Sequence, residues 1–217
     1  MDYSSNDYLK NMFNLNNKNI IVIGSASGIG KSASLAIAAH GGNLICADIQ
    51  NIESTIKAVK EINSEANVIP FEIDITNKSE IIKLMDEYDV VDGLVCTPSI
   101  NVRKLLIDYT ESEFDKVISL NLKATFNVLQ ASAKKMKLNN KGSSIVAFSS
   151  IRGSVVEPGQ SVYAASKAGT EKLVNTLAAE MAEYNIRVNT ISPGPVMTPL
   201  TDQLRNDKLW NEAYTTK

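Results

Sequence analysis

Two side chains with acid–base chemistry, Tyr163 and Lys167, stand four positions apart in a stretch that favours a helix. This spacing places both on one helix face. A lysine ammonium beside a phenol stabilises the phenolate and lowers the phenol pKa, which is about 10 when unperturbed. The pair therefore predicts a tyrosine that works as a general acid or base near neutral pH. Because such pairs also occur on solvated helix faces, other residues must support this interpretation.

Hydroxyl and amide side chains can join this pair from two other places in the chain. Ser149 and Ser150 close an apolar stretch, and Ser150 precedes Tyr163 by thirteen residues. The sites of open α/β sheets lie at the C-terminal ends of strands, so a serine there can donate to a substrate oxygen. Asn121, in a long helical stretch, can anchor a water that leads to Lys167; the alternative is an amide on the helix surface.

A glycine-rich turn follows the first apolar stretch, with Gly24, Gly28 and Gly30 in the spacing Gly-x3-Gly-x-Gly. Small residues follow, as in a helix that packs closely. Glycines let the backbone approach a pyrophosphate, and the helix N-terminus offers N–H groups and the positive end of its dipole. The turn therefore predicts a dinucleotide site, the alternative being a tight strand-to-helix turn without a ligand.

Two aspartates follow the next two apolar stretches. Asp48 comes about 20 residues after the glycine turn, where a carboxylate can accept both hydroxyls of an adenosine ribose. It would repel a 2′-phosphate, and no Lys or Arg replaces it, so NAD is favoured over NADP. A helix N-cap is the alternative for Asp48. Asp74 can face the adenine amino group or cap the following helix, and the sequence leaves both open.

The elements that must position these residues alternate regularly along the chain. We expect strands at residues 20–23, 43–47, 68–73, 90–96, 144–148 and 187–191, and helices over about 31–40, 52–62, 78–88, 111–138 and 162–184. Continuous apolar strands separated by helices indicate a parallel sheet covered on both faces. Right-handed crossovers then give a single Rossmann-like, doubly wound α/β domain.

The composition excludes several classes of protein. The chain has 217 residues, a net charge of -2 and scattered Lys and Arg, which does not suit nucleic acid or an anionic membrane. No apolar run approaches the roughly 20 residues that span a bilayer. The polar N-terminus has no signal or transit pattern, so a cytoplasmic protein is expected.

The cysteines and the histidine have structural interpretations. Cys46 and Cys96 lie in apolar stretches and are expected to be buried thiols, and two cysteines make no disulfide framework. The single histidine, His40, precedes two glycines and is expected to lie at a helix C-terminus. One histidine without a ligand cluster argues against a metal site and against a Ser-His-Asp triad.

In their order and spacing these motifs resemble the short-chain dehydrogenase/reductase family over roughly residues 14–217. The resemblance rests on the glycine turn, Asp48, Asp74, Asn121, Ser150, Tyr163-x3-Lys167 and Asn189-x3-Pro193-Gly194-x3-Thr198. It implies a catalytic tetrad of Asn121, Ser150, Tyr163 and Lys167, and hydride transfer between NAD(H) and an alcohol or ketone. It also implies a homodimer through the helices at 111–138 and 162–184, with a tetramer if a further strand follows.

The resemblance also implies sets of binding residues. Substrate contacts are expected from Ser150, Arg152 and Tyr163. Cofactor contacts are expected from Gly24, Ser27, Gly28, Ile29, Gly30, Asp48, Asp74, Ile75, Thr97, Tyr163, Lys167, Pro193, Gly194, Val196 and Thr198.

Three features depart from the family pattern. Ile23 stands where the family usually has Thr, and Cys96-Thr97-Pro98-Ser99 replaces Asn-Asn-Ala-Gly. Pro98 has no N–H and Ser99 lacks glycine's freedom, which puts cofactor affinity at this wall in question, although Thr97 can supply a hydroxyl. The chain also stops before the family's last helix and seventh strand, so it looks cut short, with strand 187–191 left as a sheet edge.

The expected organisation is an N-terminal arm at residues 1–13 and one domain at 14–217, in which 199–217 form a substrate loop. Sugars or polyols, 3-oxoacyl thioesters and steroid-like alcohols are candidate substrates. Arg152 and Glu157 favour a small polar molecule, unless they are ordinary surface charges. A non-catalytic NAD(H)-binding regulatory protein on the same fold is the competing function.

Overall fold

The structure is a computed structural model of the chain, and it describes residues 12–139, 141–202 and 212. Six parallel strands form one sheet in the order β3-β2-β1-β4-β5-β6. The strands are β1 (Asn19–Ile23), β2 (Asn43–Asp48), β3 (Val68–Glu72), β4 (Gly93–Cys96), β5 (Ser143–Phe148) and β6 (Ile186–Ile191). The predicted doubly wound sheet is confirmed, and among the described residues β6 is the edge beside β5.

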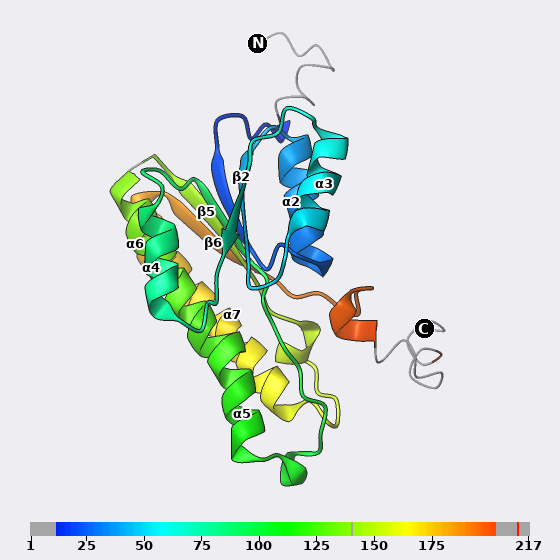
Figure 1. The fold of residues 1–217 in the computed structure, drawn as a ribbon. Coiled ribbons are helices and arrows are strands. Elements are labelled where there is room, and N and C mark those ends of the chain that lie inside the picture. The colour runs from blue at the N-terminus through cyan, green and yellow to red at the C-terminus, as the bar shows by residue number, and fades with distance from the viewer. Residues whose placement is uncertain (1–11, 140, 203–211, 213–217) are drawn as a thin grey trace.

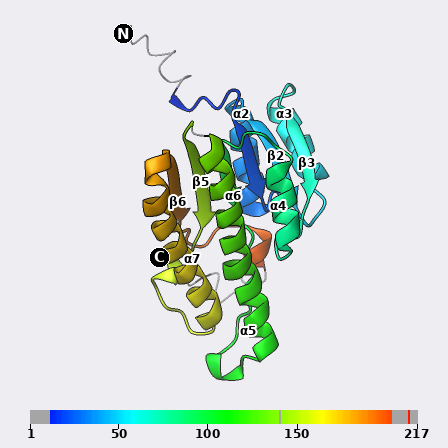
Figure 2. The ribbon, with the colours of Figure 1, turned by 90° about the vertical axis from the view of Figure 1, so that its left-hand side faces the viewer.

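Helices cover both faces of the sheet (Figures 1 and 2). On one face lie α2 (Gly28–Ala39) and α3 (Glu53–Ile62), and on the other lie α4 (Lys78–Asp86), α5 (Glu111–Ile118), α6 (Thr125–Asn139) and α7 (Ser161–Met181). Alternate residues of β1 enter two cores: Ile21 packs on the α4–α6–α7 side and Val22 on the α2–α3 side. Burial on both faces explains why the strands are continuously apolar.

The helix expected over 111–138 is interrupted where the chain carries a candidate site residue. It begins with a capping box between Thr110 and Glu113, and a π-helical segment at Ser119–Ala124 separates α5 from α6. Asn121 lies in this segment and is 0% exposed. The alternative of a surface amide is therefore wrong. Single π turns inside helices are frequent at functional sites.

The structural interpretations of the cysteines and the histidine hold. His40 is the C-cap residue of α2. Cys46 and Cys96 are buried free thiols. Burial raises the pKa of the Cys96 thiol to about 12, which makes its thiolate negligible at neutral pH.

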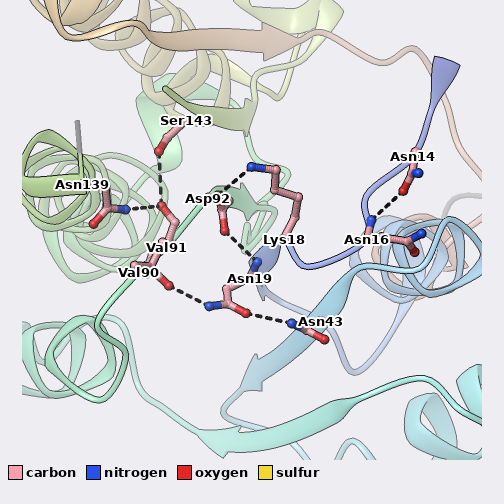
Figure 3. Close-up of polar contacts among 10 residues, drawn as sticks. All are labelled: Asn14, Asn16, Lys18, Asn19, Asn43, Val90, Val91, Asp92, Asn139 and Ser143. Carbon is pink, nitrogen blue, oxygen red and sulfur yellow. Dashed lines mark hydrogen bonds and ion pairs between the residues drawn. The ribbon is translucent and has the colours of Figure 1, made fainter. Parts of the chain in front are cut away.

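A polar network at the amino ends of the strands explains why β4 begins at Gly93 rather than at residue 90. Figure 3 shows that side chains, in place of a neighbouring strand, satisfy the carbonyl groups of Val90 and Val91. Asn19 donates to the Val90 carbonyl (3.1 Å), and Asn139 (2.9 Å) and Ser143 (3.2 Å) donate to the Val91 carbonyl.

Asp92 belongs to the same network, and its removal should destabilise the fold. Its carboxylate accepts from the Asn19 backbone N–H (2.9 Å) and from Lys18 Nζ (3.1 Å). We expect Asp92→Ala to lower the free energy of unfolding by about 1–2 kcal/mol, because a part-buried N–H loses its acceptor. Urea denaturation measures this loss. Lys18→Ala is the control and should cost less than about 0.5 kcal/mol, as for exposed ion pairs; equal losses would contradict the argument.

The described part of the chain has neither a membrane-spanning helix nor a cluster of metal-binding side chains. No helix in this part of the chain is long and apolar enough to cross a membrane. Within the same residues, no group of three or more His, Cys, Asp and Glu side chains is placed to hold a metal ion.

Candidate active site

A cavity lies at the carboxyl ends of the strands and brings together the predicted acid–base residues. Ser150 follows β5, while Tyr163 and Lys167 lie on the first turns of α7. Its wall includes three of the four predicted tetrad residues and the predicted residues after β6, namely Ser150, Tyr163, Lys167, Pro193, Gly194, Val196 and Thr198. Asn121 does not line the cavity.

The Tyr163 phenol is buried, and burial raises its pKa. The hydroxyls of Ser150 and Ser99, together with the charges of Arg103 and Arg152, act in the opposite direction. The expectation that Lys167 lowers this pKa is not met here. The reason is geometric: Lys167 Nζ donates to the Phe148 carbonyl (2.8 Å) and lies 5.7 Å from the centre of the tyrosine ring.

Lys167 is itself a buried cation with an unusual ionisation. Burial lowers the pKa of its ammonium to about 8, because the charged form loses its hydration. Close to neutral pH this lysine can therefore exchange its proton more readily than an exposed one. This property suits a residue beside a proton-transfer site.

Asn121 acts as a clamp between two elements. Its Nδ2 donates to the Ile100 carbonyl (2.8 Å) and to Ser166 Oγ (3.1 Å), and its Oδ1 accepts from the Ile100 N–H (2.9 Å). These bonds fasten the segment after β4 to α7. The side chain has both N–H groups and its carbonyl in use, so its predicted role in a water relay stays a prediction.

The glycine turn has the conformation and the close contacts that only glycine permits. Gly24 and Gly28 have φ values of +86° and +52°. A Cβ atom on Gly30 would lie 2.0 Å from the Gly24 carbonyl oxygen. The backbone of Gly30 therefore packs directly against the backbone of Gly24, and a side chain at position 30 would force the turn apart.

Asp48 and Asp74 each shape a loop, and neither caps a helix. Asp48 accepts from the N–H groups of Ala26 and Gln50 (both 2.9 Å), whereas Ile52 is the N-cap of α3. Asp74 accepts from the Thr76 N–H (2.8 Å), and α4 is capped by Asn77. The capping alternatives for both aspartates are therefore wrong.

A groove beside the cavity is lined by the residues that the sequence assigned to a dinucleotide. Its lining includes Gly24, Ser27, Gly28, Ile29, Asp48, Asp74, Ile75, Thr97 and Thr198. Its volume is about 740 Å³, within the range of cofactor sites. The groove and the cavity share Ile29, Thr97, Ser99, Thr198 and Leu200, so they adjoin. The narrow turn and the two carboxylates fit a dinucleotide, and Lys116 and Lys123 also line the groove.

Thr97 connects the wall after β4 to the glycine turn. Its hydroxyl donates to the carbonyls of Ile23 (3.0 Å) and Gly24 (3.3 Å). Ile23 lacks the hydroxyl of the threonine that the family resemblance leads one to expect there. Thr97, directly after β4, supplies a hydroxyl to the same turn. The altered sequence at 96–99 keeps the strand ends joined.

The sequence interpretation missed several residues that line the cavity. Ser99, Asn101, Arg103 and Gln160 all belong to its wall. Glu157 forms ion pairs with Arg103 (3.3 Å) and with Arg152, and both arginines line the cavity. The Arg152–Glu157 pair therefore borders the site and is not an ordinary surface pair. The available signal was position, since residues 99–103 follow β4 and its C-terminal end faces the site.

This fold and this site define a nucleotide-binding α/β protein with a tyrosine–lysine centre. The chain matches the short chain dehydrogenase family across residues 18–209. It therefore belongs to the short-chain dehydrogenase/reductase family of oxidoreductases, as the motifs predicted.

Individual relatives have several different activities in their names. The chain is 37% identical over 196 residues to 3-oxoacyl-[acyl-carrier-protein] reductase FabG of Thermotoga maritima, covering 88% of this chain and 78% of that one. It is 32% identical to human (3R)-3-hydroxyacyl-CoA dehydrogenase, covering 85% and 75%.

Solved structures share the fold closely. Levodione reductase matches with a TM-score of 0.87 and 26% identity, over 92% of this chain and 82% of that one. A candidate 2-deoxy-D-gluconate 3-dehydrogenase from Agrobacterium tumefaciens, crystallised with bound NADP, matches with a TM-score of 0.86 and 29% identity, over 94% and 81%.

Proposed function

We propose that this protein is an NAD-dependent dehydrogenase/reductase that moves a hydride between the cofactor and an alcohol or ketone, and that it works in the cytoplasm. One observation supports this most: Tyr163, Ser150 and Lys167 line a cavity that adjoins the glycine-lined groove. An absorbance assay that follows NADH over a panel of alcohols and ketones tests the activity directly.

The side chains divide the work of the reaction. When bound, the nicotinamide supplies the hydride acceptor or donor. In oxidation, Tyr163 takes the proton of the substrate hydroxyl. Ser150 Oγ accepts from the Arg152 N–H (3.1 Å), which leaves its own hydrogen for the substrate oxygen. Lys167 would hold the nicotinamide ribose, while Asn121 keeps the wall after β4 in place.

We expect NAD to bind at least about tenfold more tightly than NADP, a difference near 1.4 kcal/mol. Asp48 lines the groove, and its carboxylate would meet the 2′-phosphate of NADP as a like charge. Paired fluorescence titrations of both cofactors measure the difference. In Asp48→Ala the preference should shrink, because the repulsion is gone. Equal affinities in the unchanged protein would contradict the assignment; the NADP-bound relative makes this test necessary.

A non-catalytic NAD(H)-binding regulator is the second candidate. The altered wall at 96–99 favours it, because that wall supports the cofactor in the family that the chain resembles. The same titration, combined with the absorbance assay, separates the two functions. Cofactor binding without turnover on any substrate of the panel would favour the regulator.

We further propose a homodimer through α6 and α7. An apolar hollow between these helices is lined by Phe126, Leu129, Leu173, Leu177, Met181 and Gly169, and Phe126 is 42% exposed. Small residues on α7 permit a second copy to approach. Light scattering should give the mass of a dimer, and Leu173→Glu should shift it toward the monomer by placing a charge in the interface. Leu138→Glu, at the exposed end of α6, is the control and should leave the mass unchanged.

A further inference from the structure

A chain of polar contacts runs along the cavity wall from a carboxylate to Asn101. Glu157 is ion-paired with Arg152 and with Arg103, so its carboxylate is ionised and can only accept. Gln160 Nε2 donates to Glu157 Oε2. Asn101 Nδ2 in turn donates to Gln160 Oε1 at 2.9 Å.

The Glu157 carboxylate determines which atom donates and which accepts in each of these hydrogen bonds. Because Glu157 carries no proton, Gln160 must present its NH₂ group to it and its carbonyl to Asn101. Asn101 must then present its own NH₂ group to Gln160. Its Oδ1 atom is left over as an acceptor. This orientation follows from charge and does not depend on telling nitrogen from oxygen by shape.

The Asn101 Oδ1 acceptor has no hydrogen-bond donor near it in the described part of the chain. Asn101 Oδ1 is buried and has no hydrogen-bond partner among the residues that the structure describes. A buried carbonyl without a donor costs about 1–3 kcal/mol, and native proteins rarely keep one without a reason. Asn101 contributes to the wall of the cavity that holds Tyr163 and Ser150. The substrate can supply the missing donor when the buried Oδ1 turns toward the cavity on binding.

We infer that Asn101 is a specificity-determining residue whose Oδ1 accepts a hydrogen bond from a second hydroxyl of the substrate, close to the reacting carbinol. The inference rests on the proposed function, because Ser150 and Tyr163 serve the reacting oxygen and another group must reach Asn101. The substrate class is then a polyol or a sugar.

The other candidate substrates do not offer what this acceptor requires. A 3-oxoacyl thioester carries a second carbonyl near the reacting one, which would set acceptor against acceptor. A steroid-like alcohol has only carbon there and would leave Asn101 unpaired. Sites built to bond a substrate hydroxyl reject analogues that lack it by large factors. Ser99, which also lines the cavity, does not discriminate, since a hydroxyl both donates and accepts.

The test compares probes that differ only in the second hydroxyl. Butane-2,3-diol and butane-1,3-diol are compared with butan-2-ol, and a 3-hydroxybutyryl thioester of N-acetylcysteamine represents the acyl class. NADH formation gives kcat/KM for each probe. Calorimetry with NAD-loaded protein gives the binding of each probe independently of turnover.

We expect a diol to be preferred over butan-2-ol by at least about tenfold, as for a lost hydrogen bond to a buried group. Asn101→Leu should abolish this preference, so that the ratio of kcat/KM for the diol to kcat/KM for butan-2-ol falls close to one. Should the leucine variant fail to fold, Asn101→Ala replaces it. Ser161→Ala is the matched control, because Ser161 Oγ is also buried and unpartnered but lies outside the cavity wall; its preference should equal that of the unchanged protein.

Each outcome decides between the alternatives. Turnover with equal kcat/KM for diol and mono-alcohol, or with preference for the thioester, would overturn the inference and leave the proposed function standing. Diol binding that depends on Asn101 without any turnover would support the inference and count against the catalytic function. Failure of NAD-loaded protein to bind or oxidise either diol would overturn the inference. The proposed function would then be tested by the cofactor titration and the absorbance assay without reference to diols.

Discussion

Tyr163→Phe should lower turnover by about 10³-fold, within the range for loss of a general acid–base group. The phenol oxygen is the atom that moves the proton, and the other hydroxyls in the described cavity lining belong to serines and threonines, which are much weaker acids than a phenol. The ring only lines the pocket, and NAD binding should stay nearly unchanged. NADH formation under saturating substrate measures the first effect, and a cofactor titration measures the second.

Tyr88→Phe is the matched control for this experiment. Tyr88 packs against the core beside α4, away from the cavity, and burial also raises its phenol pKa. Its loss should leave turnover within about twofold, as for substitutions away from the site. If Tyr163→Phe kept most of the activity, the acid–base assignment would be wrong.

Lys167→Met should remove most turnover and at the same time stabilise the folded protein. The pKa of Lys167 falls from 10.5 to about 8 on folding, because burial strips the ammonium of water. A lysine pKa that is lower in the folded state means that the unfolded chain binds the proton more strongly, so the charge opposes folding. The penalty is complete below pH 8 and disappears as the pH rises to 10.5. Removing the ammonium should therefore raise the free energy of unfolding at pH 7 by up to about 3 kcal/mol.

Urea denaturation at pH 7 and at pH 10.5 measures this difference. The variant should be more stable at pH 7 and similar to the unchanged protein at the higher pH. Lys57→Met, on the exposed face of α3, is the control and should change stability by less than about 0.5 kcal/mol at either pH. A variant that is less stable at pH 7 would show that the bond from Lys167 to the Phe148 carbonyl outweighs the desolvation.

Much of the molecule was predictable because it depends on local sequence order. The alternation of apolar and helical stretches determined the parallel sheet, and the glycine spacing determined the turn, since positive φ at Gly24 and Gly28 is a local requirement. Tyr163 and Lys167 share a face because they are four residues apart on a helix. Errors fell mostly at the ends of elements, as at Val90 and Val91, whose carbonyls bond side chains distant in sequence.

The tertiary structure decided what the side chains do once they meet. It showed Lys167 bonded to the Phe148 carbonyl, Asn121 used as a clamp on Ile100, and Asn101 left with an unpaired acceptor. None of these follows from spacing, because burial and hydrogen-bond partners come from segments far apart in the chain. The sequence by itself determined the family, and it predicted the glycine-lined groove and the tyrosine–lysine pair, since these depend on local motifs. The ionisation of Lys167 and the unpaired acceptor of Asn101 required the packed molecule, because desolvation and hydrogen-bond partners depend on the whole surroundings of a side chain.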